Sequence, residues 1–228
     1  MKTQSQILNY PSLSEALFLE SSVSNTQRNI RYVILALAGS ALLKAATGED
    51  ASNEELGGAE MQSVITGLVE YLAKDDSEAL NIARDLVNKL NWQVPNQENQ
   101  LIPSNDPKYS IDEIPGIVPI DYKRGYDIRE VVARIVDGSD FMELKPRFGI
   151  TMVCVQAEIE GHKCGILANN GPIDTQGANK AAQFIQLCDQ IDIPLIFLNN
   201  VTGYMVGKKY EQAGMIKHGS KMIQAVSN

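Results

Sequence analysis

The stretch IPLIFLNNVTGYMVGKKYEQAGMIKHGSKMI, residues 193–223, gives the clearest indication of the fold. Its first seven residues, IPLIFLN, form a short apolar run that predicts a buried strand. The segment EQAGMIKHGSKMIQAV, residues 211–226, spaces its apolar residues as a helix does. Between them, the turn TGYMVG holds two glycines, which permit a tight backbone path and a close approach to a ligand.

The segments around this stretch extend the pattern. TMVCVQAEIEGHKCGILAN, residues 151–169, predicts two strands joined by a tight turn at Glu160-Gly161. GANKAAQFIQLCDQI, residues 177–191, predicts an amphipathic helix, and DIREVVARIV, residues 127–136, predicts another helix. Strand, helix, strand and helix in this order predict an α/β fold with a βαβ layer and parallel pairing.

The first ninety residues predict mainly helices. Ser52 can cap a helix over SNEEL that Gly57-Gly58 ends, and AEMQSVITGLVEYLA, residues 59–73, predicts a second helix. Asp76 can cap a third, SEALNIARDLVNKLN, whose apolar residues fit one helical face. The run VILALAGSALLKAA, residues 33–46, is shorter than the roughly 20 apolar residues that span a bilayer, so it predicts a buried strand or helix.

Composition excludes several classes of partner. The formal net charge is −8 over 228 residues and no basic run stands out, so neither nucleic acid nor a membrane surface is an expected partner. The three cysteines form no metal-binding spacing and predict buried free thiols in a reducing, cytoplasmic setting. His162 and His218 have no triad or metal partners at suitable spacing, so no metal site is expected. No secretory signal is visible, because polar residues follow Lys2.

Two glycine-containing loops follow apolar strands and are the candidate site. LANNGPIDTQG follows the strand that ends near residue 168, and NNVTGYMVG follows the strand at 193–199. In open α/β sheets, ligands lie outside the carboxyl ends of the strands, where backbone amides can stabilise an enolate or a tetrahedral oxyanion. The alternative is that the glycines only permit tight turns, and the pattern taken alone favours this alternative.

Four long segments carry a resemblance to a known family. The chain resembles the carboxyltransferase (beta) subunit of biotin-dependent acyl-CoA carboxylases over about residues 36–228. The NNG and TGYMVG forms look like the methylcrotonoyl-CoA and geranyl-CoA branch. The segments are LLKAATGEDASNEELGGAEM (42–61), DYKRGYDIREVVARIVDGSDFMELKPRFG (121–149), GILANNGPIDTQGANKAAQFIQLCDQ (165–190) and IPLIFLNNVTGYMVGKKYEQAGMIKHGSKMIQAV (193–226).

The resemblance implies parts of two related crotonase-like (ClpP/crotonase) domains. Residues 1–93 would end the upstream, acyl-CoA-binding domain, with residues 1–32 unmatched. Residues 94–119, rich in Pro, Asn and Asp, would link the domains, and residues 120–228 would begin the downstream, biotin-binding domain. The family implies a homo-oligomer that works with a biotin carboxylase/biotin carrier alpha subunit, on which the biotin is carried.

The implied reaction moves CO₂ from carboxybiotin to a branched enoyl-CoA, 3-methylcrotonoyl-CoA or geranyl-CoA, through biotin and acyl-CoA enolates held by backbone amides. Such an enzyme is an acyl-CoA carboxylase, a ligase that forms C–C bonds. The resemblance assigns the biotin-side amides to Gly203, Tyr204 and Met205. The residues that would line the same cleft are Asn169, Asn170, Gly171, Val206 and Gly207.

The chain also departs from the family. Gln62 stands where the family usually has His, Val64 where a basic residue is usual and Val155 where a small residue is usual. The glycine-rich segments that complete each oxyanion hole have no match, so we expect no activity from the isolated chain. Two alternatives therefore stand beside the carboxyltransferase: a non-catalytic remnant that associates with full-length subunits, and a crotonase-like acyl-CoA binder or decarboxylase.

Overall fold

The structure is a computed structural model that describes residues 39–90, 104–121, 124–201 and 203–227. The chain divides into two compact units, residues 1–62 and 63–228. Residues 1–32, which the resemblance leaves unmatched, lie outside the described residues, as do residues 33–38, residues 94–103 and Thr202 of the glycine turn. The assignment of residues 1–93, 94–119 and 120–228 to two domains and a linker stays a prediction.

The described part of the first unit consists of short helices, α2 (Ser40–Thr47), α3 (Asn53–Gly57) and α4 (Ala59–Met61). The predicted cap of α3 is confirmed, because Ser52 and Glu55 form a reciprocal capping box. The prediction that 33–46 is buried is wrong for its described part. No residue of α2 is buried, since no other described element of this unit covers its apolar side chains.

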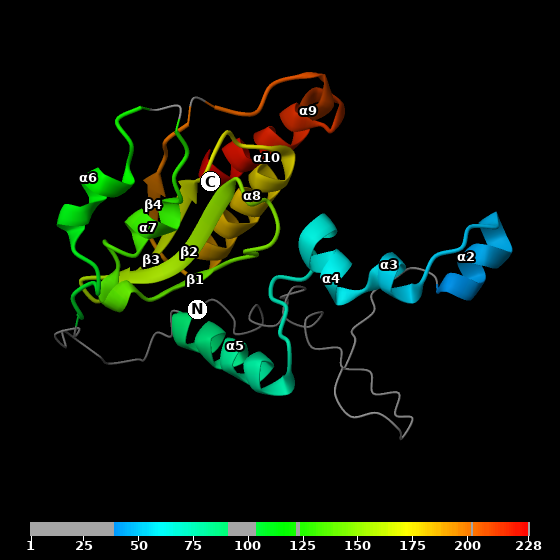
Figure 1. The fold of residues 1–228 in the computed structure, drawn as a ribbon, viewed down its shortest axis with the longest axis horizontal. Coiled ribbons are helices and arrows are strands. Elements are labelled where there is room, and N and C mark those ends of the chain that lie inside the picture. Colours follow the sequence, from blue (N-terminus) through cyan, green and yellow to red (C-terminus); the bar gives the residue numbers. More distant parts are fainter. Residues whose placement is uncertain (1–38, 91–103, 122–123, 202, 228) are drawn as a thin grey trace, which may run out of the picture. The chain divides into compact units, whose positions relative to one another are not determined.

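The second unit is built on a four-stranded sheet in the order β1-β2-β3-β4 (Figure 1). Strands β2 (Met152–Ile159) and β3 (His162–Asn169) form the predicted antiparallel hairpin, and Glu160 and Gly161 both take positive φ in the turn between them. Strand β1 (Phe141–Glu143) is antiparallel to β2. Strand β4 (Leu195–Leu198) pairs in parallel with β3, which confirms the predicted βαβ unit.

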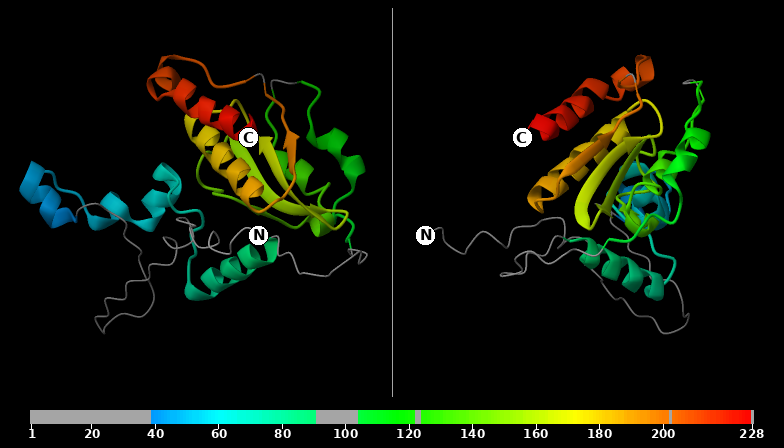
Figure 2. Two further views of the ribbon diagram at one scale, coloured as in Figure 1. Left: turned by 180° about the vertical axis from the view of Figure 1, so that it is seen from behind. Right: turned by 90° about the vertical axis from the view of Figure 1, so that its left-hand side faces the viewer.

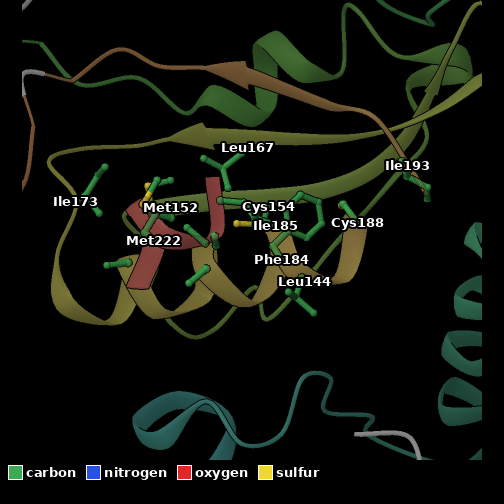
Figure 3. Packing of buried hydrophobic residues seen from close by; sticks show 14 of the residues in the cluster. Leu144, Met152, Cys154, Leu167, Ile173, Phe184, Ile185, Cys188, Ile193 and Met222 are labelled. Carbon is green, nitrogen blue, oxygen red and sulfur yellow. The ribbon is translucent and has the colours of Figure 1, made fainter. Parts of the chain in front are cut away.

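Helices cover both faces of this sheet (Figures 1 and 2). On one face lie α8 (Thr175–Gln190) and α10 (Met215–Ser227), which enclose the core cluster shown in Figure 3. On the other face, α6 (Ile114–Ile117) and α7 (Ile128–Val132) pack against a second cluster that contains Val153, Val155 and Ile166. The sheet is thus the middle layer of three.

Several predicted elements differ from those observed. Strand β4 is only partly buried, with Phe197 40% exposed, because it is the last strand of this sheet and has a neighbour on one side only. The helix expected over 211–226 is divided into α9 (Lys208–Gln212) and α10, since Gly214 takes a φ of 83° between them. The helix expected over 127–136 stops at Val132 and continues as turns to the short 3₁₀ segment Asp137–Ser139.

The helices near the start of the second unit are also shorter or shifted. The helix expected over 59–73 ends with the π-helical segment Gln62–Thr66, because Gly67 takes a φ of 68°. Helix α5 (Asp76–Lys89) forms as predicted, but Asp75 and not Asp76 caps it. No residue of α5 is buried against the described part of the chain, although its apolar spacing follows the helical template. One further 3₁₀ segment, Ile111–Glu113, precedes α6.

The predicted burial of the cysteines is confirmed. Cys154, Cys164 and Cys188 are free and buried, and burial raises the pKa of Cys154 and of Cys188 to about 12. Among the described residues, no helix is long and apolar enough to cross a membrane.

Helix α8 is fixed at its start by an N-cap. The Asp174 carboxylate accepts hydrogen bonds from the Gly177 amide at 2.6 Å and from the Thr151 hydroxyl at 3.1 Å. We expect Asp174→Ala to lower the free energy of unfolding by about 1 kcal/mol, the usual value of an N-cap. Urea denaturation measures this change. Asp189→Ala is the control, since Asp189 is exposed near the other end of the helix, and an equal loss in both variants would contradict the capping role.

Candidate functional site

The glycine turn runs beside the segment that follows β3. Ile173 and Tyr204 form an isolated parallel bridge, in which the Ile173 amide donates to the Gly203 carbonyl at 3.3 Å and the Met205 amide donates to the Ile173 carbonyl at 2.8 Å. Gly203 has a φ of 145°, which an L side chain rarely adopts. The bridge therefore continues the parallel pairing of β3 and β4 beyond the sheet, to the place where the resemblance puts the site.

The amides of this turn are not equivalent. Those of Gly203 and Tyr204 donate to no acceptor among the described residues. The Met205 amide is already bonded to Ile173. The expectation that Met205 offers its amide to an oxyanion is therefore corrected: this amide holds the turn in place.

The side chain of Tyr204 anchors the turn to α10. Its hydroxyl donates to the Gly219 carbonyl at 3.2 Å, and its ring lies so close to Gly219 that an added Cβ would be 3.2 Å from the ring. Burial raises the pKa of Tyr204, so the phenol stays protonated at neutral pH and can serve as this donor.

Asn169 joins the two loops of the candidate site. Its side chain is buried and accepts from the Asn200 amide at 2.8 Å, while its own amide group donates to the carbonyls of Asn200 at 3.1 Å and Gly171 at 3.2 Å. The two bonds to Asn200 connect the end of β3 with the chain just after β4, and the third holds the loop that follows β3. Asn169 is therefore a structural link between the two loops, with its side chain engaged by the protein.

Asn170 is engaged in the same way by α7. Its side-chain oxygen accepts from the Ile128 amide at 2.7 Å, and its side-chain nitrogen donates to Asp127 at 3.1 Å. Burial raises the pKa of Asp127, but hydrogen bonds from the Arg129 amide and Asn170 and the charge of Arg129 outweigh burial and lower it. Asp127 is consequently an anion that holds both Asn170 and Arg129.

The remaining predicted lining residues are more open. An added Cβ at Gly171 would meet no atom within 4 Å, and Val206 is 80% exposed. Gly207 has a φ of 125° and begins α9, where its carbonyl accepts from Tyr210 and Glu211. Gly171 and Val206 are thus open to solvent, whereas Gly207 shapes the exit of the turn.

No group of three or more His, Cys, Asp or Glu side chains in the part of the chain that the structure describes could hold a metal ion. His218 contacts Asn179 through Nδ1 at 2.9 Å, which links α10 to α8. Burial lowers the pKa of His218, and the charges of Lys221 and Lys217 lower it further. His218 is therefore a neutral residue at pH 7 that packs α10 against α8.

We expect Lys221→Gln to raise the pKa of His218 towards its ordinary value, because the variant removes a neighbouring positive charge. A folded-state pKa below the unfolded value stabilises the fold at high pH, and this contribution is lost as the pH falls below about 6.5 through the folded-state pKa. An NMR titration of the imidazole measures the pKa. Lys209→Gln is the control, and an equal rise there would contradict the local origin of the effect.

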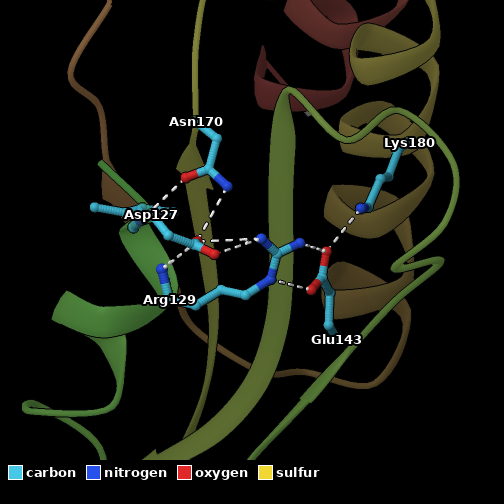
Figure 4. Close-up of polar contacts among 6 residues, drawn as sticks. Asp127, Arg129, Glu143, Asn170 and Lys180 are labelled. Carbon is cyan, nitrogen blue, oxygen red and sulfur yellow. Dashed lines mark hydrogen bonds and ion pairs between the residues drawn. The ribbon is translucent and has the colours of Figure 1, made fainter. Parts of the chain in front are cut away.

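The sequence patterns did not single out a set of charged residues that adjoins the site. Glu143 on β1 contacts Lys180 of α8 at 3.0 Å and Arg129 of α7 at 2.7 and 2.9 Å, and Arg129 also reaches Asp127 (Figure 4). Lys180 is fully buried. Its spacing from Gly177 and Phe184 places it on the apolar face of the predicted helix, and this was the available signal, because a buried lysine needs an anionic partner.

Comparisons with known proteins show which proteins this chain is similar to. The methylcrotonoyl-CoA carboxylase beta chain of Dictyostelium discoideum is 47% identical over 84% of this chain, which covers 32% of that protein. The beta subunit of geranyl-CoA carboxylase from P. aeruginosa is 51% identical, with a TM-score of 0.54 over 84% of this chain and 36% of that one. The transcarboxylase 12S structure gives a TM-score of 0.77 at 38% identity, over 86% of this chain and 39% of that one.

This chain therefore spans about a third of the length of the curated relatives that it matches. The structural neighbours confirm the predicted crotonase-like α/β carboxyltransferase fold. The family model for the carboxyl transferase domain matches residues 26–228. The chain therefore belongs to the carboxyl transferase domain family.

Proposed function

We propose that this chain forms the biotin side of the carboxyltransferase site in a biotin-dependent acyl-CoA carboxylase. The acceptor we propose is a branched enoyl-CoA, 3-methylcrotonoyl-CoA or geranyl-CoA. The similarity to beta subunits that are named for these two carboxylases supports the choice of acceptor. The geometry of the turn at 203–205 supports the location of the site.

One observation carries the proposal: two adjacent backbone amides, of Gly203 and Tyr204, have no acceptor among the described residues. They lie just beyond the carboxyl end of β4, where ligands of open α/β sheets bind. Fixed N–H donors stabilise an oxyanion without any side chain having to ionise. This donor set fits the ureido oxygen of biotin, whose negative charge increases when its carboxyl group leaves as CO₂.

The remaining parts of this chain have matching roles. Met205 and Tyr204 hold the turn, through the Ile173 carbonyl and the Gly219 carbonyl respectively, so that the two free amides keep their direction. Gly171 and Val206 are open to solvent, and in this proposal they face the bicyclic ring. In this proposal, residues 1–93 belong to the acyl-CoA-binding domain and residues 120–228 to the biotin-binding domain. The biotin is carried by a partner subunit, and the carboxyltransferase is a homo-oligomer.

Biotin binding tests the location of the site. We expect free biotin, titrated into ¹⁵N-labelled chain, to shift the amide signals of Gly203 and Tyr204 more than that of Met205. Valeric acid, which has the side chain of biotin without the ureido ring, is the control ligand. Gly203→Ala should abolish the shifts, since alanine strains a φ of 145° and redirects the amide. The matched control is Gly116→Ala in α6, where a Cβ meets no atom within 4 Å.

Activity tests the reaction. The chain is mixed with a biotin-carrying alpha subunit, ATP, bicarbonate and 3-methylcrotonoyl-CoA or geranyl-CoA, and acyl-CoA-dependent phosphate release and carboxylated product are measured. Product that depends on the acyl-CoA supports a carboxyltransferase. Biotin binding without product is the result that we expect of the isolated chain, while neither biotin shifts nor product would contradict the proposal.

A further inference from the structure

A continuous series of ion pairs runs from the core to the candidate site. Lys180 Nζ contacts Glu143 at 3.0 Å, and Arg129 donates to both Glu143 oxygens, through Nε at 2.7 Å and Nη2 at 2.9 Å. Arg129 Nη1 then contacts Asp127 at 3.1 Å. The charges alternate in sign, and the Lys180 and Glu143 side chains are 0% and 8% exposed. We name these four residues the ion chain.

The ion chain joins both faces of the sheet. Lys180 comes from α8, which covers one face, Arg129 comes from α7 on the other face, and Glu143 lies on the edge strand β1 between them (Figure 4). Arg129 bonds through all three of its guanidinium nitrogens, and the single ammonium group of a lysine cannot make the same set of bonds. Because Lys180 and Glu143 are buried, leaving either of them unpaired would be costly, and this favours the observed arrangement of α8, β1 and α7.

The ion chain ends on the two loops of the candidate site. Asp127 accepts from the side chain of Asn170, which follows β3. The adjacent Asn169 holds both backbone groups of Asn200, three residues before Gly203. The position of α7 is therefore transmitted through two asparagine side chains to the segment that enters the glycine turn.

We propose that Glu143 and Arg129 are positioning residues, which hold the loop 169–171 and the turn 203–205 in the arrangement that presents the Gly203 and Tyr204 amides. Neither residue touches a ligand in this role. The role of this arrangement in carboxyl transfer rests on the proposed function. The coupling of the ion chain to the two loops does not rest on it.

Arg129→Lys tests the coupling, since it keeps the charge but loses the two-pronged bond to Glu143. We expect amide hydrogen exchange of residues 169–173 and 203–207 to become about tenfold faster or more, with little change in β2 and β3. Arg134→Lys is the matched control. Among the described residues, Arg134 forms ion pairs with the exposed carboxylates of Glu113 and Glu130, and neither carboxylate bonds to residues 169–171 or 203–205.

A double variant separates local coupling from general destabilisation. Asn170→Ala should produce the same local increase, and Arg129→Lys/Asn170→Ala should add little, because both changes break one series of contacts. Additive effects, or a uniform increase over all segments, would overturn the proposal. In addition, Arg129→Lys should weaken biotin binding about tenfold, whereas Arg134→Lys should not. A wild-type chain that fails to bind biotin contradicts the proposed function, while the exchange measurements still decide the coupling.

Discussion

Replacing Glu143 with glutamine should lower the free energy of unfolding by about 3–5 kcal/mol. Among the described residues, Glu143 is the ion-pair partner of Lys180, whose side chain is 0% exposed, and it also binds Arg129. Glutamine keeps the shape but removes the negative charge, so a buried ammonium group is left without an anion. Urea denaturation of the purified chain, followed by far-UV circular dichroism, measures the loss.

Two comparisons show whether burial causes this loss. Lys180→Met in the Glu143→Gln background should recover part of the stability, since the stranded cation is then gone. Glu113→Gln removes a carboxylate that is also bonded to an arginine, but its side chain is 54% exposed, and the expected cost is at most about 1 kcal/mol. Equal losses for Glu143→Gln and Glu113→Gln would contradict the argument from burial.

Much of the second unit could be predicted because its elements have regular spacing. The hairpin of β2 and β3 has a turn that demands positive φ, and Gly161 supplies one of the two positions easily. The helix α8 has an apolar face long enough to identify its type and its approximate limits. Glycines limited the accuracy elsewhere, because Gly67 and Gly214 end helices that the apolar pattern alone would continue.

The burial of an element is harder to predict from the sequence than whether the element is a helix or a strand. Strand β4 is apolar, yet it is the edge strand of the described sheet, and its sequence cannot say whether another strand will pair with it. The same holds for α5, whose apolar face is not buried against the described residues of its unit. An apolar sequence indicates that a surface is more stable when it is buried. It does not indicate which other element will bury that surface, because this depends on the three-dimensional structure.

The sequence predicts where the candidate site lies, but the role of each residue in it follows only from three-dimensional contacts. The sequence predicts that the loops at 169–171 and 203–207 line one site, and in the structure Asn169 binds Asn200 while Ile173 pairs with Tyr204. No pattern could show that the Met205 amide is taken by Ile173, because that bond joins residues 32 positions apart. For the same reason, the sequence does not distinguish Glu143 from the other carboxylates, because its cationic partners Arg129 and Lys180 are identified only by their positions in the fold.

The second large effect is expected at Gly165, the glycine of β3, which faces side chains of α8 and β4. An added Cβ would lie 2.6 Å from Cys188 Sγ, 3.0 Å from Leu195 Cδ2 and 3.2 Å from Phe184 Cε1. All three distances are shorter than ordinary van der Waals contact, and Cys188 and Phe184 are buried. We expect Gly165→Ala to lower the free energy of unfolding by about 1–3 kcal/mol, the usual cost of overpacking a core.

The nearest neighbour offers a specific rescue of this variant. Cys188→Ala removes the sulfur atom that the new methyl group meets, so Gly165→Ala/Cys188→Ala should lose less stability than the sum of the two single variants. Gly116→Ala is the control for the amino-acid change itself, since its Cβ meets no atom within 4 Å, and it should be neutral or slightly stabilising. Urea midpoints of the four variants decide the matter. If the double variant loses the full sum, the close approach of α8 to β3 at Gly165 is not what limits the packing there.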